Sequence, residues 1–361
     1  MTGGSIRRRA AGTASLAALL VVGCHRPADP SPEPVSPAER VAWVRPGGPN
    51  PEPVWGTKGG LAVGLWPTGG PRGLIRVYAP YLGQPFPRVV NFISIEPVVG
   101  RVRAQSELDA SPGDGRPGLT FWTADSLTEV IAPKAPNGPA PGVVKRVGDA
   151  EALTFFLAAE PFRNGARPAI EVVLRSDRPH EVRFRIHSVG GARVDSCVLS
   201  ATMGNYGRLR RLWLRGEVVD ARKVWPAPTF DRLGFVPWRA WPAERMLLAN
   251  GDRVAAATTD EADPAGAAYD PAVPAHWRYQ GRPATHYWRA PDAPGLVVRV
   301  NGRATYWGNG GPIPGGLAFE NFELEAPFAD GQEFRFGVTP DPPAALGFDP
   351  TREQNTTAGD Q

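Results

Sequence analysis

Two similar segments hold the side chains best suited to chemistry, residues 276–279 (HWRY) and 286–289 (HYWR). Residues 280–283 between them resemble a turn, so antiparallel pairing would bring both segments onto one small area. Aromatic rings cover the apolar face of a sugar, arginine pairs with carboxylate or hydroxyl groups, and histidine moves protons near neutral pH. The segments therefore predict a sugar site, with His286 as the acid–base group. The ligand-binding residues expected there are His276, Tyr287, Trp288 and Arg289. The alternative is a pair of half-buried strands with core aromatics.

An acidic strand supplies the expected partner of His286. Asn321 and Glu323 share one face of this strand, while Phe322 and Leu324 share the other. Sugar epimerisation and β-elimination both need a base and an acid across the ring, and Glu323 beside His286 would provide them. Asn321 is then a ligand-binding neighbour. A solvated strand face is the plain alternative.

A third candidate follows the segment 204–207 (GNYG), where Asn205, Tyr206 and Arg208 are expected to bind a ligand. Residues 193–223 carry seven basic and three acidic side chains, and guanidinium groups pair well with uronate or sulfate. This stretch therefore predicts a binding site for acidic polysaccharide. The alternative is that arginine is simply the usual surface cation of this chain, which has 36 Arg among its 40 Lys+Arg residues.

Two loops are further candidates. Glu96 leads into the polar stretch 101–114, which is expected to form the rim of a site, either as structure or as a ligand contact. The Gly/Pro-rich segment 310–316 is either a binding loop or a wide connection. The sequence contains no His-x-His, His-Glu-x-x-His, paired Cys, nucleophile elbow, phosphate loop or dinucleotide fingerprint. We therefore expect no metal and no cofactor.

Strands must position these residues. The chain has 42 Gly and 41 Pro, which leave little room for long helices, and residues 181–187 alternate strictly with Val182, Phe184 and Ile186 facing inward. Asn301-Gly302 predicts a tight hairpin whose second strand carries Trp307 on the core face. Strands at 320–326 and 332–338 are expected to pair with each other. Many short strands without a repeat predict an all-β fold, one large antiparallel β-sandwich.

The N-terminus has the features of an export signal. Three arginines precede an apolar stretch, residues 10–22, that is too short to span a bilayer. The segment 21–24 (VVGC) resembles the lipobox of bacterial lipoprotein precursors. That resemblance implies cleavage before Cys24, acylation of its sulfur and anchoring in the cell envelope, with His25 favouring the outer membrane. An ordinary secretory signal with an incidental cysteine is the alternative.

Removal of residues 1–23 lowers the formal charge from +4 to +1, because three Arg and no acid are lost. Nucleic-acid binding loses its main support, since it needs a concentrated basic surface. Cys197 is then the remaining thiol and is expected in the core.

Four parts are expected along the chain: a signal peptide (1–23), a proline-rich tether (24–54), a β-sandwich domain (55–339) and a disordered tail (340–361). The domain is similar in size and strand density to galactose-mutarotase-like supersandwich proteins. The match does not extend to the catalytic motif of that family.

Three functions remain open from the sequence. The first is a lipid-anchored polysaccharide lyase or sugar epimerase, which requires His286, Glu323 and Arg289 in one cleft. The second is a non-catalytic module that binds glycans, acidic ones included. The third is a structural envelope lipoprotein with a protein partner, which predicts an exposed apolar patch and no concave site. The oligomeric state is left open.

Overall fold

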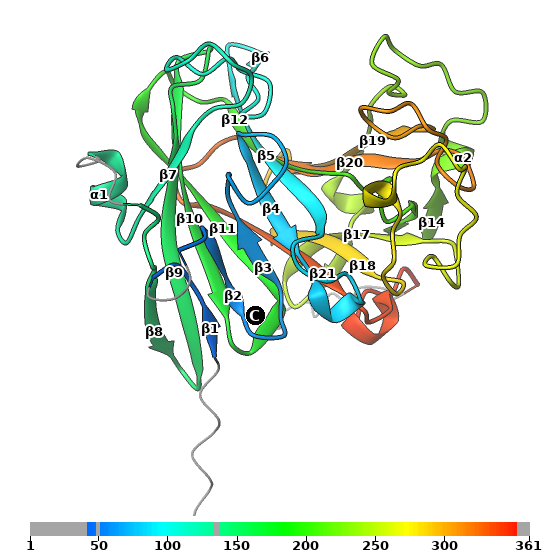
Figure 1. Cartoon of the computed structure of the whole chain (residues 1–361), viewed down its shortest axis with the longest axis horizontal. Helices are drawn as coiled ribbons and strands as arrows, with labels where there is room; N and C mark the ends of the chain where they lie inside the picture. Colours follow the sequence, from blue (N-terminus) through cyan, green and yellow to red (C-terminus); the bar gives the residue numbers. More distant parts are fainter. Residues whose placement is uncertain (1–41, 48–50, 133–137, 352–361) are drawn as a thin grey trace, which may run out of the picture. The chain divides into compact units, whose positions relative to one another are not determined.

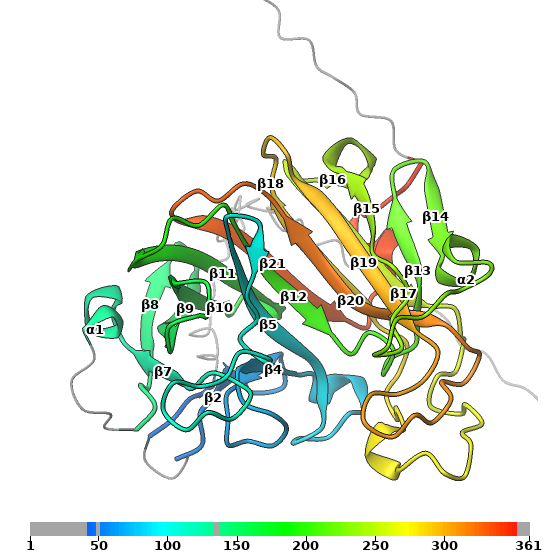
Figure 2. The ribbon, with the colours of Figure 1, turned by 90° about the horizontal axis from the view of Figure 1, so that it is seen from above.

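The computed structural model describes residues 42–47, 51–132 and 138–351 of the 361-residue chain. Its regular structure is almost entirely β, and the strands form two large antiparallel sheets stacked on each other (Figures 1 and 2). The all-β sandwich predicted from the alternating pattern is therefore confirmed. The predicted signal peptide, Cys24 and the end of the predicted tail lie outside the described residues.

The first sheet has ten strands. They are β1 (Trp43–Val44), β2 (Val54–Thr57), β3 (Ala62–Gly64), β4 (Leu74–Tyr78), β5 (Val89–Val99), β6 (Val102–Arg103), β12 (Ser196–Thr202), β15 (Arg239–Pro242), β19 (Val297–Arg303) and β20 (Ala318–Glu325). The order across the sheet is β1-β2-β3-β4-β5-β12-β20-β19-β15, and β6 pairs with β5. Strands from both ends of the chain thus meet in its middle.

The second sheet has eleven strands. They are β7 (Phe121–Ala124), β8 (Val143–Val147), β9 (Ala150–Ala159), β10 (Ala166–Arg175), β11 (Arg178–Gly191), β13 (Leu209–Leu214), β14 (Glu217–Asp220), β16 (Leu247–Ala249), β17 (Asp252–Thr259), β18 (Thr285–Pro291) and β21 (Gln332–Thr339). The order is β14-β13-β17-β18-β21-β11-β10-β9-β7, with β16 on β17 and β8 on β9.

Helical structure is limited to short turns within the described residues. These are η1 (Pro80–Leu82), α1 (Leu127–Ile131), α2 (Ala221–Val224), η2 (Ala243–Arg245), η3 (Ala275–Trp277) and η4 (Pro343–Leu346). Among the helices described, none is long and apolar enough to cross a membrane.

The core lies between the two sheets and follows the period-two pattern of the sequence. Phe184 of β11 and Trp288 of β18 are fully buried on the inner face of the second sheet, and Phe322 of β20 meets them from the first. The Trp288 indole N–H donates to the Phe322 carbonyl at 2.8 Å across this interface. Burial of each such side chain contributes about 1.5–3 kcal/mol. Cys197 is also buried in this cluster, as predicted.

The folded part of the chain extends beyond both predicted boundaries. β1 lies within the predicted tether, where it pairs with β2, and the Trp43 indole donates to Glu151 at 3.0 Å. At the other end, Phe348 of the predicted tail is buried and its ring contacts Tyr287 edge to face. The proline-rich or polar composition of these segments predicted no structure. Both are ordered by contacts with residues that lie elsewhere in the sequence.

The Asn301-Gly302 pair does not form the predicted hairpin. β19 continues through both residues and pairs with β15 and β20. The register with β20 shifts between Val300 and Gly302, which is a β-bulge. A Cβ at Gly302 would lie 2.5 Å from the Ala318 carbonyl oxygen, so the glycine permits a close approach of two backbones rather than a turn. Trp307, predicted in the core, is 41% exposed.

Two other predicted pairings are corrected. β20 and β21 form as strands, but they belong to different sheets, so 320–326 and 332–338 do not form a hairpin. Residues 275–277 form η3 rather than a strand, and β18 pairs with β17 and β21 instead. Pairing is decided by contacts across the whole chain, whereas turn motifs report only local preference.

Candidate functional site

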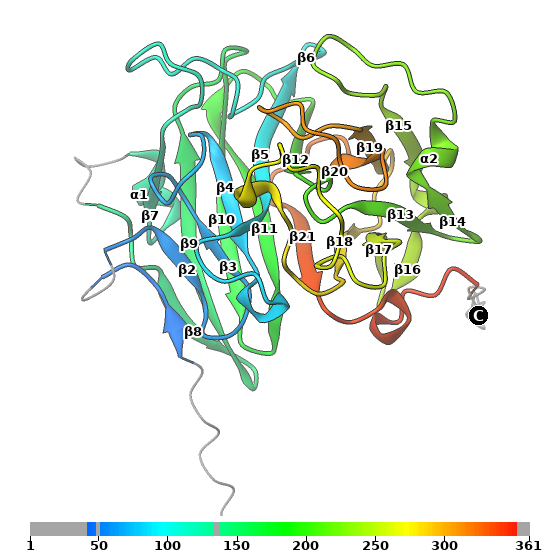
Figure 3. The ribbon, with the colours of Figure 1, turned by 45° about the vertical axis from the view of Figure 1, so that its right-hand side comes forward.

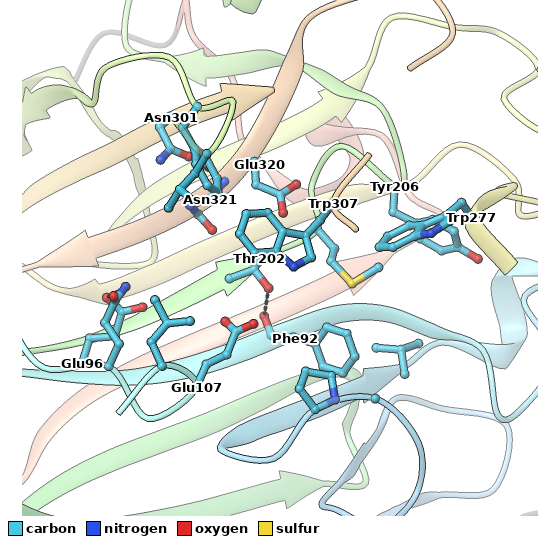
Figure 4. Close-up of a pocket in the computed structure, with 18 of the residues that line it drawn as sticks. Phe92, Glu96, Glu107, Thr202, Tyr206, Trp277, Asn301, Trp307, Glu320 and Asn321 are labelled. Atoms are coloured by element: carbon cyan, nitrogen blue, oxygen red, sulfur yellow. Dashed lines mark hydrogen bonds between the residues drawn. The ribbon is translucent and has the colours of Figure 1, made fainter. Parts of the chain in front are cut away.

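A cleft of about 1400 Å³ opens on the outer face of the first sheet. Its floor consists of strand residues whose neighbours face the core. Ile93 and Ile95 of β5 are buried between the sheets, so Phe92 and Glu96 project outward into the cleft. The other floor residues are Thr202 of β12, Asn301 of β19, and Glu320 and Asn321 of β20 (Figure 4).

Loops from several parts of the chain form the walls. Figure 3 shows the short yellow helical turn η3 and the orange loop after β19 in front of the strands of the first sheet. The wall residues come from the turns before β4 and β5, the loop after β6, the segment between α2 and β15, and the η3 and β19 loops. They include Gly69, Gly70, Arg88, Glu107, Leu108, Phe230, Asp231, Phe235, Trp238, His276, Trp277 and Trp307.

The bulge in β19 and β20 explains how the floor acquires its polar groups. Phe319 and Phe322 both face the core, so the two residues between them are displaced to the outer side. As a result Glu320 and Asn321 both line the cleft, although neighbouring strand residues normally point to opposite faces. The Asn321 backbone N–H donates to the Asn301 side-chain oxygen at 3.2 Å. Bulges of this kind re-aim side chains next to binding sites.

Glu320 is the most unusual polar group of the site. It is 5% exposed, and its Oε2 atom has no hydrogen-bond partner among the described residues. Burial raises the pKa of this carboxyl to about 7; Arg303 opposes the shift and the charge of Glu107 adds to it. A carboxyl with such a pKa can give or take a proton near neutral pH.

Glu107 provides a second carboxyl of the same kind. It is half-buried in the loop after β6, and burial together with the charge of Glu96 raises its pKa to about 7. In Figure 4 the side chains of Glu107 and Glu320 enter the cleft from different elements, with Trp307 drawn between them. The cleft therefore holds two carboxyls that are both partly protonated at neutral pH.

Glu96 and Glu323 are neutralised by arginine at one end of the cleft. The Arg103 guanidinium donates to both oxygens of Glu323, at 3.0 and 2.7 Å, and pairs with Glu96 as well. Arg103 and Arg299 also lie over the Trp238 ring, at 5.5 and 5.0 Å from its centre. Glu323 is fully buried beneath this cap, with no face presented to a ligand.

Aromatic side chains give the walls a stackable surface. Arg303 lies over the rings of Phe235 and Trp307, at 4.7 and 4.9 Å from their centres, and holds both in place. Trp277 stacks on Tyr306 with ring centres 5.6 Å apart and 24° between the planes. Since Trp307 is 41% exposed, a large aromatic face is open to a ligand.

Arg208 and Arg210, in the middle of the predicted basic stretch 193–223, are buried, whereas Arg211 and Arg215 are exposed and do not line the cleft. Arg208 is fully buried, and its guanidinium donates to Glu261 at 2.8 Å and to the Tyr269 hydroxyl at 2.5 Å. Asn205 is buried as well, and neither polar atom of its side chain has a partner among the described residues. Tyr206 does line the cleft and accepts a hydrogen bond from Gln84 at 2.9 Å. Arg208 therefore stabilises the structure behind the cleft wall and is not exposed to a ligand.

The predicted pairing of His286 with Glu323 is not formed. His286 shares the inner face of β18 with Trp288 and is 3% exposed, so it lies in the core between the sheets. Burial lowers its pKa to about 3, which keeps the ring neutral at ordinary pH. Glu323 lies on the outer side of β20, opposite to its core neighbours Phe322 and Leu324. The first sheet separates the two side chains.

Tyr287 and Arg289 also lie away from the cleft. They occupy the outer face of the second sheet, where the Tyr287 hydroxyl donates to Glu181 at 3.0 Å. Arg289 donates to Asp252 at 2.9 Å. Both line a small pocket of about 220 Å³. The two predicted segments are thus split among the cleft, the core and the opposite face.

Four residues singled out from the sequence do meet in the cleft: Glu96, Tyr206, His276 and Asn321. Trp277 was marked only within the segment 276–279, and Glu107 only within the rim stretch 101–114. Glu320 and Asn301 were not predicted as site residues, and Trp307 was predicted in the core. One signal was available for Glu320. Two polar residues in succession between Phe319 and Phe322 break the alternation, which indicates a bulge.

Comparisons with known proteins and the search for a metal centre add no further assignment. No protein-family model matches the sequence, and a search of curated proteins finds no significant match. In the part of the chain that the structure describes, no group of His, Cys, Asp or Glu is arranged to hold a metal ion.

Proposed function

We propose that this chain binds a glycan in the outer cleft of the first sheet and acts on it by acid–base chemistry through Glu107 and Glu320. The observation that carries the proposal is the pair of carboxyls, each with a pKa raised to about 7, in one aromatic-walled cleft. This pair takes the place of the His286 and Glu323 pair predicted from the sequence.

The chemistry follows from the protonation of the pair. Near pH 7 the Glu107 and Glu320 carboxyls are each about half protonated, so a state with one carboxylate and one carboxylic acid is well populated. The carboxylate removes a proton from a sugar carbon, a hydroxyl or an attacking water, and the acid delivers a proton to a ring or leaving oxygen. Total charge is conserved, and elimination, epimerisation and hydrolysis all fit this step.

The aromatic walls support a sugar rather than a small polar substrate. Trp277 and Trp307 present flat apolar faces, which suit the C–H faces of pyranose rings. Asn301 and Asn321 add amide groups that can bind hydroxyls. A cleft of about 1400 Å³ has room for several sugar units.

A glycan screen with the purified full chain tests the proposal. Bound polysaccharides are assayed for new reducing ends, unsaturated products and epimerised sugars. We expect Glu107→Gln and Glu320→Gln each to lower kcat/KM by about 10²–10⁴-fold, because each removes an acid–base group. Glu244→Gln is the matched control, since Glu244 is exposed in η2 and does not line the cleft. Turnover that survives in both cleft variants contradicts the proposal.

The same screen distinguishes a non-catalytic module. Glycan binding that is retained by wild type and both variants, with no product from any bound glycan, would leave only the binding function.

We also propose that the mature chain is anchored to the cell envelope through acylated Cys24. The lipobox-like segment 21–24 supports this assignment. Radiolabelled palmitate should be incorporated into the wild-type chain in a bacterial host and should be absent from Cys24→Ser. Equal labelling of both chains contradicts the anchor.

A further inference from the structure

The charges that line the cleft are mostly negative. Glu96 is already paired with Arg103, which leaves three acids, Glu107, Asp231 and Glu320, against Arg88, the one Lys or Arg among the described lining residues. Such a surface repels an anionic ligand and favours a cationic one. The acidic polysaccharide predicted from the basic stretch is therefore a poor match for this cleft.

The arginines around the cleft are already engaged. Arg103 is held by Glu96 and Glu323, and Arg299 pairs with Glu325. Arg303 donates to the carbonyl of Thr305 at 3.0 Å and to the carbonyl of Leu233.

Arg88, at the Tyr206 end, donates to the Arg278 carbonyl at 3.0 Å. A uronate therefore meets few guanidinium donors that are still available, and bidentate pairing needs two of them in one plane.

A buried acceptor without a donor lies at the floor. Glu320 is 95% buried, since 5% of its surface is exposed, and its Oε2 atom lacks a partner among the described residues. A buried carboxylate oxygen without a donor is costly, so a ligand that supplies one is favoured. An ammonium group supplies three donors and a positive charge, and the faces of Trp277 and Trp307 attract the same charge.

We propose that the glycan bound in this cleft carries free amino groups, with an ammonium held by Glu320 and Glu107 against the aromatic wall. The inference rests on the proposed function, because it takes the cleft as a glycan site and names the class of sugar. Amino sugars combine the two features that the cleft offers, an apolar ring face for the aromatic walls and a cation for the carboxyls.

Binding should release protons. The charges facing Glu320 are those of Arg303 and Glu107, and Glu96 faces Glu107. A ligand that is already an ammonium lowers the pKa values of both carboxyls from about 7, so the pair loses part of its bound proton when the ligand binds. The fraction that stays protonated is the acid of the proposed function. A neutral sugar does not produce this change.

Titration calorimetry of the full chain with three tetrasaccharides tests the inference. The ligands are a glucosamine oligomer, its fully N-acetylated form and a galacturonate oligomer, measured in buffers of different ionisation enthalpy. We expect the glucosamine oligomer to bind at least about tenfold more tightly than the other two and to release protons. Glu320→Gln should lose about tenfold in affinity for the amine and little for the N-acetylated ligand. Glu244→Gln should change neither.

The outcomes separate this inference from the proposed function. If the N-acetylated or galacturonate oligomer binds as tightly as the amine, the amino-sugar assignment is wrong and the glycan site stands. If the amine binds equally well to wild type, Glu320→Gln and Glu107→Gln, the ammonium position is wrong. If no glycan of the wider screen binds, the proposed function fails as well. Thermal unfolding of each variant shows whether it is folded.

Discussion

The outer faces of the two sheets differ in how completely their charged residues are paired. On the second sheet, carboxylates and arginines alternate in a continuous set of pairs across neighbouring strands. Arg185 bonds Glu171 at 2.9 Å, and Asp252 accepts from both Arg289 and Arg335, at 2.9 and 2.6 Å. On the first sheet, Arg103 pairs with Glu96 and Glu323, but the carboxyls of Glu320 and of Glu107, in the loop after β6, face the cleft without an arginine bonded to them. Paired charges stabilise a surface, whereas unpartnered ones are available to a ligand.

The difference shows which polar residues can be functional. Both faces are rich in ionisable groups, so composition does not separate them. What separates them is whether each charge is met by an opposite charge within the fold, because an unmet buried carboxyl shifts its pKa toward neutrality. Arg289 and Glu323, which the sequence predicted as site residues, are both paired within the fold, Arg289 with Asp252 and Glu323 with Arg103.

The largest expected effect comes from breaking the paired face. Asp252→Asn should lower the free energy of unfolding by about 3 kcal/mol or more, because two guanidinium groups lose their shared carboxylate. Denaturant unfolding measures the change. Asp292→Asn is the control, because Asp292 pairs with Arg253 but its side chain is 52% exposed. We expect the free energy of unfolding to change by less than about 1 kcal/mol there. Equal effects at the two sites would remove the distinction.

Removing the carboxyl of Glu320 from the cleft should stabilise the chain at alkaline pH, whereas removing Asp252 destabilises it. The pKa of Glu320 is about 7 in the folded chain and ordinary in the unfolded one, so the folded state holds more protons between about pH 4.5 and 7. The contribution of Glu320 to stability therefore falls as pH rises through this window. Glu320→Gln removes this contribution, a difference of about 3 kcal/mol at pH 8 relative to pH 4, while the contributions of Glu107 and His286 remain in both proteins. A pH series of unfolding free energies measures it; parallel curves for the two proteins contradict the assignment.

The core position of His286 makes a prediction with the opposite pH sign. Its pKa is about 3 when folded and about 6.5 when unfolded. Between these two pH values the unfolded state holds more protons, so this residue lowers stability as pH falls. His286→Leu should remove about 2 kcal/mol of the stability difference between pH 8 and pH 5. Glycan turnover by folded His286→Leu should match that of wild type. Lost turnover with unchanged stability would return His286 to the site.

The smallest expected effect concerns the aromatic wall. Trp307→Ala should weaken glycan binding by about 1 kcal/mol, or about fivefold in Kd, because one stacking face is lost. Unfolding should barely change, since the side chain is 41% exposed. Leu248→Ala, an exposed apolar residue of β16, is the control and should leave Kd unchanged. Affinity that is the same in both variants places the ligand elsewhere.

The fold was largely predictable because strand formation leaves a local trace. The alternation of Val182, Phe184 and Ile186 marks an inner face, and all three are buried as expected. The pairing of strands left no comparable trace. Asn301-Gly302 has the preferred residues of a tight turn, yet the neighbouring strand made it a bulge. The same pair of residues serves both purposes because each needs a compact, flexible backbone.

The sequence by itself determined the class of fold, the inner faces of its strands and the aromatic and carboxyl residue types available to a site. Only the tertiary structure decided which of them meet. Glu107 and Glu320 are far apart along the chain and become neighbours in one cleft because a loop and a bulge on the first sheet place them there. The physical reason is that alternation is a property of adjacent residues, whereas burial and pKa depend on everything packed around a group.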